Sequence, residues 1–234
     1  MTDVTNRTLL SPSARPSTFV LFTLSFVSMF PLQNVQAQVV FEEFTETNLS
    51  TAQLSVTVST PAGTTQDDLL IAAIAVDRGV ASSLAPPPGE GWALIDVGNG
   101  GGQQVTLGVW WKLAAASESP THEFTWASPT QQSYAWMMRF TGHDPAAPID
   151  VSATIANTAT LMPVSPAVTT TVANAMILRL GGFDDDDVTI DDPGLPGHTA
   201  ITMDISGTGF GTVSGGAGYV LQAATGDSGT STSN

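Results

Sequence analysis

One stretch of the chain, residues 69–76, contains no polar side chain and is bounded by acidic residues, Asp67 and Asp68 before it and Asp77 after it. A strand with one face in water alternates apolar and polar residues, whereas a strand buried on both faces need not. The pattern therefore predicts an inner strand of a sheet that is covered on both sides.

Shorter segments around this run alternate apolar and polar residues with the period of two that is typical of half-buried strands. The strongest are residues 52–60, 92–97, 103–113, 121–126 and 133–141, and the weaker ones are residues 149–155 and 167–172. A second nearly continuous apolar run covers residues 174–182, and the last apolar segment covers residues 217–224. The polar tail, residues 225–234, is expected to be loosely held.

Turn-forming residues separate these segments. The 22 glycines and 15 prolines are scattered between short β-rich runs, and the glycine-rich residues 207–218 suit a flexible or bulged segment. No stretch after the N-terminus has the periodicity of a convincing amphipathic helix. About ten to twelve strands at short intervals predict an all-β protein, an antiparallel jelly-roll-like β-sandwich that forms a single domain over residues 51–234.

The first 37 residues have the pattern of a secretory signal peptide. An apolar run at residues 18–32 follows Arg7 and Arg15 and precedes residues 33–37, which place small or aliphatic residues at the two positions that a signal peptidase reads. The run is shorter than the ~20 residues of a membrane-spanning helix. We therefore expect cleavage after Ala37, export, and a mature chain that is free of the membrane.

The mature chain would begin with residues 38–50, a short β-prone segment. Such a segment suits either an edge strand or an arm that donates a strand to another molecule. In the second case the interface would consist of its apolar residues, Val39, Val40, Phe41 and Phe44.

Composition narrows the classes of partner. The formal net charge is −15, and removal of residues 1–37 leaves 20 acidic and 4 basic residues, a charge of −16. Such a charge repels polyanions at long range, which argues against nucleic-acid binding. Because the chain has no cysteine, it has neither a disulfide scaffold nor a thiolate metal site.

The order of segments is itself characteristic: DDLLIAAIAVD, PPPGEGW, LGVWWKLAAASE, HEFTW, RFTGHDPAAPID and NAMILRLGGFDDDD. This succession, from about Asp67 to Asp227, resembles a group of secreted or phage-associated bacterial β-sandwich domains. The resemblance implies a jelly-roll-like sandwich and a surface or extracellular setting, without established catalytic residues. Similar chains continue past the equivalent of Ser228 into a further apolar strand, whereas this sequence ends in polar residues at Asn234.

The most charged segment is a candidate calcium site. Its acidic residues are Asp184, Asp185, Asp186, Asp187, Asp191 and Asp192. Clustered carboxylates in a loop suit Ca²⁺, which takes about six to eight oxygen ligands. The spacing does not match an EF-hand loop, and four consecutive side chains cannot all converge on one ion. A solvated acidic loop is therefore the competing interpretation.

The aromatic residues give a second candidate site. Four of the five tryptophans lie on the apolar face of their strands, which predicts core positions. Trp110 lies on the face opposite Trp111, so we expect it to be exposed and able to stack on a sugar ring. The three histidines match no zinc motif, and no nucleophile or pair of carboxylates stands out.

These features favour a non-enzymatic, secreted structural subunit. Its partner would be further copies of itself, joined at the cell surface into a filament or layer by donation of the N-terminal segment. The alternative is an extracellular carbohydrate-binding module, with Trp110 as the stacking residue and Ca²⁺ in the acidic loop.

Overall fold

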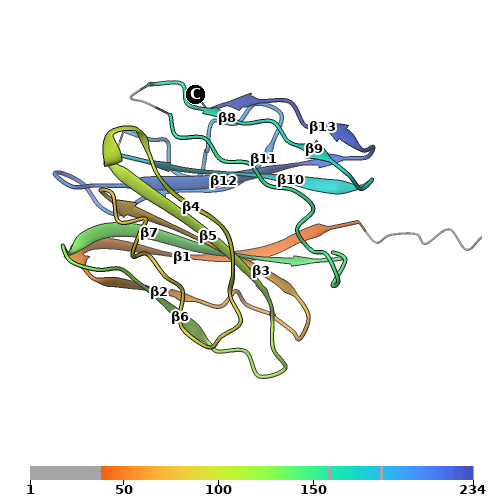
Figure 1. Cartoon of the computed structure of the whole chain (residues 1–234), viewed down its shortest axis with the longest axis horizontal. Helices are drawn as coiled ribbons and strands as arrows, with labels where there is room; N and C mark the ends of the chain where they lie inside the picture. The colour runs from red at the N-terminus through yellow and green to blue at the C-terminus, as the bar shows by residue number, and fades with distance from the viewer. Residues whose placement is uncertain (1–37, 158–159, 185–186, 234) are drawn as a thin grey trace, which may run out of the picture. The chain divides into compact units, whose positions relative to one another are not determined.

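The central apolar run is the middle strand of a five-stranded antiparallel sheet, called the main sheet below (Figure 1). The structure is a computed structural model that describes residues 38–157, 160–184 and 187–233. The predicted signal peptide, residues 1–37, lies outside the described residues. In the order β1-β7-β3-β5-β4, the strands are β1 (Val40–Gln53), β7 (Gln131–Thr141), β3 (Leu69–Asp77), β5 (Val105–Leu113) and β4 (Ala93–Asn99).

Further strands cover both faces of the main sheet, as the stacked layers in Figure 1 show. One face carries a second sheet, with the order β10 (Ala175–Phe183), β12 (Ser214–Gln222) and β11 (Thr199–Ile205). The other face carries the antiparallel pair β2 (Ser55–Ser59) and β6 (Thr121–Thr125). Beyond the second sheet lie two short pairs: β8 (Val164–Ser165) with β14 (Ser231–Thr232), and β9 (Thr169–Thr170) with β13 (Gly226–Asp227).

The predicted fold class is confirmed: the described part of the chain is an all-β sandwich of antiparallel sheets. It contains ten strands of five or more residues and four strands of two residues, together with the 3-10 turn η1 (Gly101–Gln103). The longer strands account for the expected number. The described residues all fall within one compact unit, residues 36–234.

All nine residues of β3 are buried, as the apolar run predicts. The side chains of its even-numbered residues, from 70 to 76, pack toward β2 and β6. Those of its odd-numbered residues, from 69 to 75, pack toward the second sheet. A fully buried leucine or isoleucine contributes about 1.5–3 kcal/mol relative to an exposed one. Two-sided burial therefore gives this strand more core energy than a half-buried strand of equal length.

Strand β5 is also buried on both faces, which the alternation of its residues does not reveal. Val105 and Val109 face the second sheet, whereas Trp110 and Lys112 face β2 and β6 and are only 3% and 6% exposed. The Trp110 ring lies against Phe124 of β6, with centroids 5.4 Å apart. The prediction that Trp110 is exposed is therefore wrong, because the β2–β6 pair covers this face of the main sheet.

Part of the glycine-rich segment is a regular strand. The sequence predicts a flexible or bulged segment at residues 207–218, but residues 214–218 belong to β12. Glycine is required there because the fully buried Trp136 ring of β7 lies directly on the backbone of β12. A Cβ atom at Gly215 would be 2.6 Å from that ring. The missing side chains thus allow the second sheet to approach the main sheet closely.

Two other strand predictions are corrected. Residues 149–155 form no strand, and all of them except Ile149 are exposed. Asp150 instead accepts a 2.8 Å hydrogen bond from the Thr171 amide. Strand β11 is absent from the sequence-based prediction. Its residues 201–205 nevertheless alternate apolar and polar side chains, a pattern that indicates a strand. The irregular pairing with β12 lies just before this run, between Ala200 and Thr202.

The C-terminal segment is held firmly, contrary to the prediction of a loose tail. The buried guanidinium of Arg179 donates to the carbonyl oxygens of Ser228 and Gly229 at 3.3 and 2.7 Å. It also donates to the Ser165 hydroxyl at 2.6 Å and to the Pro166 carbonyl at 3.0 Å. One side chain with five N–H donors thus fixes the layer formed by β8, β9, β13 and β14.

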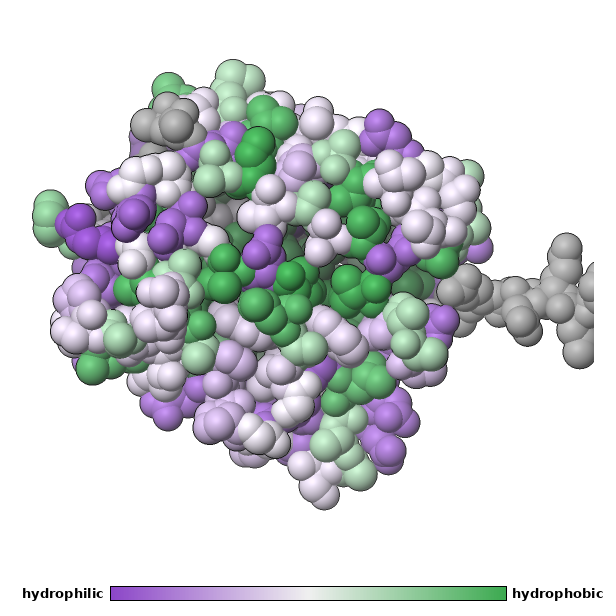
Figure 2. Space-filling model, viewed as in Figure 1, coloured by the Kyte–Doolittle hydropathy of each residue, from purple (hydrophilic) through white to green (hydrophobic). Residues whose placement is uncertain are grey.

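Hydrophobic side chains form an interrupted band across the face shown in Figure 2, at the level between the main and second sheets. The connection from β7 to β8 crosses this face (Figure 1). Its exposed apolar residues include Val151, Ile155, Leu161 and Met162. The sandwich is therefore less completely covered along this edge than at its centre.

Among the described residues, no helix has the length and hydropathy of a membrane span.

Candidate functional site

Strand β1 forms one edge of the main sheet, where it pairs with β7 of the same chain over ten residue pairs. Of the predicted interface residues, Val39, Phe41 and Phe44 are partly buried against the core and Val40 is 47% exposed. Phe41 packs edge-on against Phe140, with ring centroids 5.7 Å apart. The segment expected to be an edge strand or an arm is thus an edge strand in this structure.

Polar side chains also join β1 to the second sheet. The Glu46 carboxylate accepts hydrogen bonds from the hydroxyls of Tyr134 at 2.6 Å and Thr202 at 2.9 Å, two residues without solvent exposure. The side-chain amide of Asn48 donates to the Ile205 carbonyl at 2.6 Å. Burial, and secondarily the bond to Glu46, raises the pKa of Tyr134. Without β1, both buried hydroxyls would lose a charged acceptor.

Only Leu54 separates β1 from β2, and the chain reverses there into the layer on the other face of the main sheet. The Thr45 hydroxyl donates to the Ser59 carbonyl, and the Thr47 hydroxyl donates to the Thr57 carbonyl at 2.9 Å. Strand β2 therefore runs back along β1. A connection this short favours strand exchange, since opening one residue converts two strands into one extended strand.

The acidic loop is described only in part. Asp184, Asp187, Asp191 and Asp192 are described, and Asp185 and Asp186 lie outside the described residues. The Asp192 carboxylate accepts a 2.9 Å hydrogen bond from the Gly194 amide and stabilises the turn that it begins. Among described residues, no group of three or more histidine, aspartate or glutamate side chains is placed to hold a metal ion. The calcium site stays a prediction.

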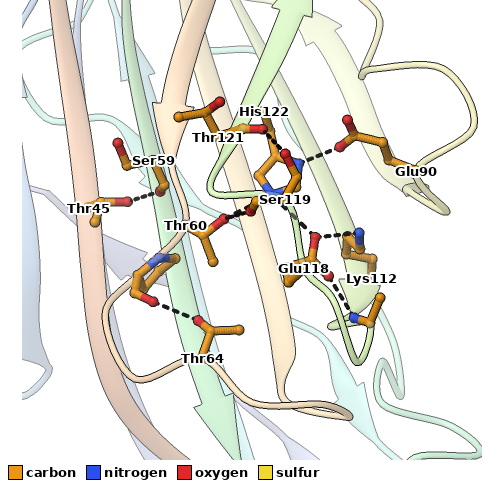
Figure 3. A network of polar contacts seen from close by, with 12 residues as sticks. Thr45, Ser59, Thr60, Thr64, Glu90, Lys112, Glu118, Ser119, Thr121 and His122 are labelled. Atoms are coloured by element: carbon orange, nitrogen blue, oxygen red, sulfur yellow. Dashed lines mark hydrogen bonds and ion pairs between the residues drawn. The ribbon is translucent and has the colours of Figure 1, made fainter.

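A buried polar cluster lies between β6, the end of β5 and the loop before β4 (Figure 3). His122 of β6 stands between two carboxylates, with Nδ1 2.5 Å from Glu90 Oε2 and Nε2 3.4 Å from Glu118 Oε1. Lys112 Nζ donates to Glu118 Oε1 at 2.7 Å. Thr60 Oγ1 lies 3.1 Å from His122 Nε2. Four ionisable side chains thus meet in one place.

The order Thr60, His122, Glu90 is that of a nucleophile, its base and an orienting carboxylate. The Thr60 hydroxyl, however, donates its single proton to the Ser119 carbonyl at 2.5 Å and not to the ring. The His122 side chain is also fully buried. The geometry therefore suits a structural cluster that attaches two loops to the β2–β6 layer.

The ion pair within this cluster is desolvated. The side chains of Lys112 and Glu118 are 6% and 8% exposed. Burial opposes ionisation of Glu118, but the bonds from Lys112 and the Ala115 amide outweigh it and hold the pKa of Glu118 below its ordinary value. Lys112 Nζ also lies 5.5 Å from the centre of the Trp92 ring, a cation–π contact.

Two hollows of about 250 and 300 Å³ open at the end of the sandwich where β3 finishes. Asp77, Arg78, Phe210 and Gly211 border both of them. Phe210 lies in the loop between β11 and β12 and is 92% exposed. This site combines an exposed aromatic ring with the charged side chains of Asp77 and Arg78.

Sequence analysis missed Phe210 and Glu118 for different reasons. Phe210 has a usable signal, because a lone aromatic residue between Gly209 and Gly211 has no alternating neighbours that would bury it. Glu118 has no such signal, since no sequence period relates it to Lys112 or to its other partners. The site around Phe210 could therefore have been predicted from the sequence, whereas the buried cluster could not.

Comparisons with protein-family models, with curated proteins and with solved structures found no match. The functional argument therefore rests on the geometry of this chain.

Proposed function

We propose that this chain is a secreted, non-enzymatic structural subunit that assembles with copies of itself at the cell surface by exchanging β1. The observation that carries the proposal is the position of β1. It is the first strand of the described chain, it lies at a sheet edge, and one residue connects it to β2. Such a strand leaves its place without threading any other segment, and a second copy offers an identical place.

The contacts of β1 support exchange because they are the same within one chain and between two. Phe41 and Phe44 would fill the same apolar positions in a neighbour, and Glu46 would meet the neighbour's equivalent hydroxyls. The exchange then depends mainly on the hinge at Leu54 and on protein concentration. Reciprocal exchange closes a dimer, whereas head-to-tail exchange stays open and extends into a filament or layer.

The chemical character of the chain fits this setting. The signal-peptide pattern predicts export, and the acidic net charge keeps an exported sheet protein soluble while discouraging indiscriminate pairing of sheet edges. The edge of β1 is also protected by charged side chains, Glu42 and Glu43. Assembly would therefore rely on exchange of a matched strand and not on general edge pairing.

An engineered disulfide tests the exchange directly. Val40 and Thr141 are partners in the β1–β7 pair, and antiparallel partners have Cα separations of about 4.5–5.5 Å, which suit a disulfide. Because the chain has no cysteine of its own, Val40→Cys with Thr141→Cys introduces the only thiols. Oxidation of assembled protein should give a ladder of covalent oligomers on a non-reducing gel, whereas unexchanged strands give monomers.

The matched control places the disulfide where exchange is not expected. Met176→Cys with Leu221→Cys joins partners in β10 and β12, and its oxidation should leave monomers. A ladder from this control would mean random cross-linking. Wild-type protein that stays monomeric at high concentration by sedimentation and electron microscopy would refute the structural role. Polymers whose β1 disulfide is entirely intramolecular would refute exchange.

A further inference from the structure

The Phe210 ring is the most exposed large apolar side chain among the described residues, at 92%. The neighbouring glycines hold it there, because Gly209 and Gly211 adopt φ angles of 103° and 80° that disfavour other residues. Phe210 borders both of the hollows described above. Single exposed apolar side chains are common on protein surfaces, and Leu161 is 91% exposed as well. Phe210 differs because it also borders both hollows, where a ligand in either one would contact its ring.

The floor of the site is the carboxylate of Asp77 at the end of β3. Its side chain is 9% exposed, and Arg78 Nε lies 3.9 Å from Asp77 Oδ2. A Cβ atom at Gly211 would lie 3.2 Å from this oxygen, so the glycine leaves the carboxylate accessible from the hollows. Burial raises the pKa of Asp77, and nearby Asp184 adds to this although Arg78 opposes it. Keeping a charge in such a place costs stability, which suits a functional group.

Amide side chains complete the walls. Gln104 borders one hollow and Gln132 the other. Gln132 is fixed in place, since its Nε2 donates to the Phe210 carbonyl at 3.1 Å and its Oε1 accepts from the Ser206 hydroxyl at 3.1 Å. The site thus presents an acceptor-only carboxylate, a donor-only guanidinium and amides that do both.

We propose that this site, formed by Asp77, Arg78, Gln104, Gln132 and Phe210, binds a neutral carbohydrate. A sugar ring has an apolar C–H face, which packs on the negative face of an aromatic ring. Its hydroxyl groups both donate and accept, which matches the mixture of groups in the two hollows. Phe210 borders both hollows, so a chain of sugar units stacked on its ring would extend into them.

The charges favour a neutral ligand over the alternatives. The net charge of −15 repels anionic polymers. A basic peptide would meet Arg78 beside the carboxylates, whereas sugar hydroxyls accept from that guanidinium. None of the five residues lies in β1, although Ala52 of β1 also borders the second hollow. Substitutions at the five positions therefore change this site without changing β1 itself.

Isothermal titration calorimetry of the purified protein with neutral oligosaccharides of glucose, xylose, mannose and N-acetylglucosamine tests this proposal. At least one should bind, and Phe210→Ala should weaken it about tenfold or more, the equivalent of ~1.4 kcal/mol. Asp77→Asn should also weaken binding without lowering the melting temperature. Leu221→Ala, which removes another exposed apolar side chain at the far end of β12, should bind like the wild type.

Several results would overturn the proposal. These are no binding of any sugar at millimolar concentration, equal affinity of Phe210→Ala and the wild type, or binding of an oligolysine peptide in place of the sugars. Phe210→Ala should fold like the wild type, because a residue that is 92% exposed contributes little to the core. Weaker binding by this variant would therefore not result from unfolding. The oligomeric state of each variant should match the wild type, which separates this site from the proposed assembly.

Discussion

Replacing Glu118 by glutamine should be strongly destabilising, because it removes a negative charge bonded to the buried Lys112. The Nζ to Oε1 distance is 2.7 Å, and the side chains are 6% and 8% exposed. Breaking a pair that is this desolvated leaves an uncompensated charge and costs about 3–5 kcal/mol. For a domain of this size that corresponds to a fall in melting temperature of roughly 6–20 °C.

Urea unfolding at pH 7 should measure this loss, with Glu42→Gln as the matched control. Glu42 lies 4.0 Å from Arg139, and these side chains are 34% and 15% exposed, so its replacement should cost less than ~1 kcal/mol. In a double-mutant cycle, Lys112→Met with Glu118→Gln should lose less than the sum of the single changes, by about 1 kcal/mol or more.

The effect of acid follows from the lowered pKa of Glu118. A carboxyl group whose pKa is lower in the folded state than its ordinary value of 4.5 adds stability above that value, and the contribution is lost as the pH falls through the folded pKa. The stabilities of the wild type and Glu118→Gln should therefore converge in acid. A loss at pH 7 no larger than that of Glu42→Gln would show that the cluster is solvated and refute the reasoning.

Three further predictions concern other parts of the fold. Gly108→Ala should lower the free energy of unfolding in urea by about 1–3 kcal/mol, because the new Cβ atom would lie 2.3 Å from the Trp110 ring. Its control is Gly98→Ala, where the new Cβ atom would meet no atom within 4 Å, and which should change stability by less than ~0.5 kcal/mol. Arg179→Met should speed amide hydrogen exchange at residues 226–232 about tenfold or more and leave residues 69–76 protected. Asp77→Asn should raise the melting temperature at neutral pH, because the pKa of Asp77 is raised by folding; the gain should vanish below its ordinary value of 3.8, where Asp77 is neutral in both states. An unchanged exchange pattern, or a pH-independent difference for Asp77→Asn, would contradict these accounts.

The inner position of β3 was predictable because eight consecutive apolar residues leave no face for water. The second face of β5 was not, since its burial depends on β2 and β6, which pack there only after the chain folds. The sequence could not decide whether β1 is an edge strand or an arm, for a similar reason. Glu46 and its partner Thr202 are separated by 156 residues, and no local pattern shows that a carboxylate near the start of the chain completes a hydroxyl pair in the core.

The contact between Trp136 and Gly215 has a consequence for variation. Because the indole ring occupies the volume that a Cβ atom at Gly215 would need, at 2.6 Å, neither position can change in size by itself. A smaller residue at Trp136 leaves a cavity, and a larger residue at Gly215 forces the two sheets apart. Related chains that differ at one position should therefore differ at the other, with total volume conserved. The residues at positions 136 and 215 therefore set the spacing between the two sheets together, and they should vary together.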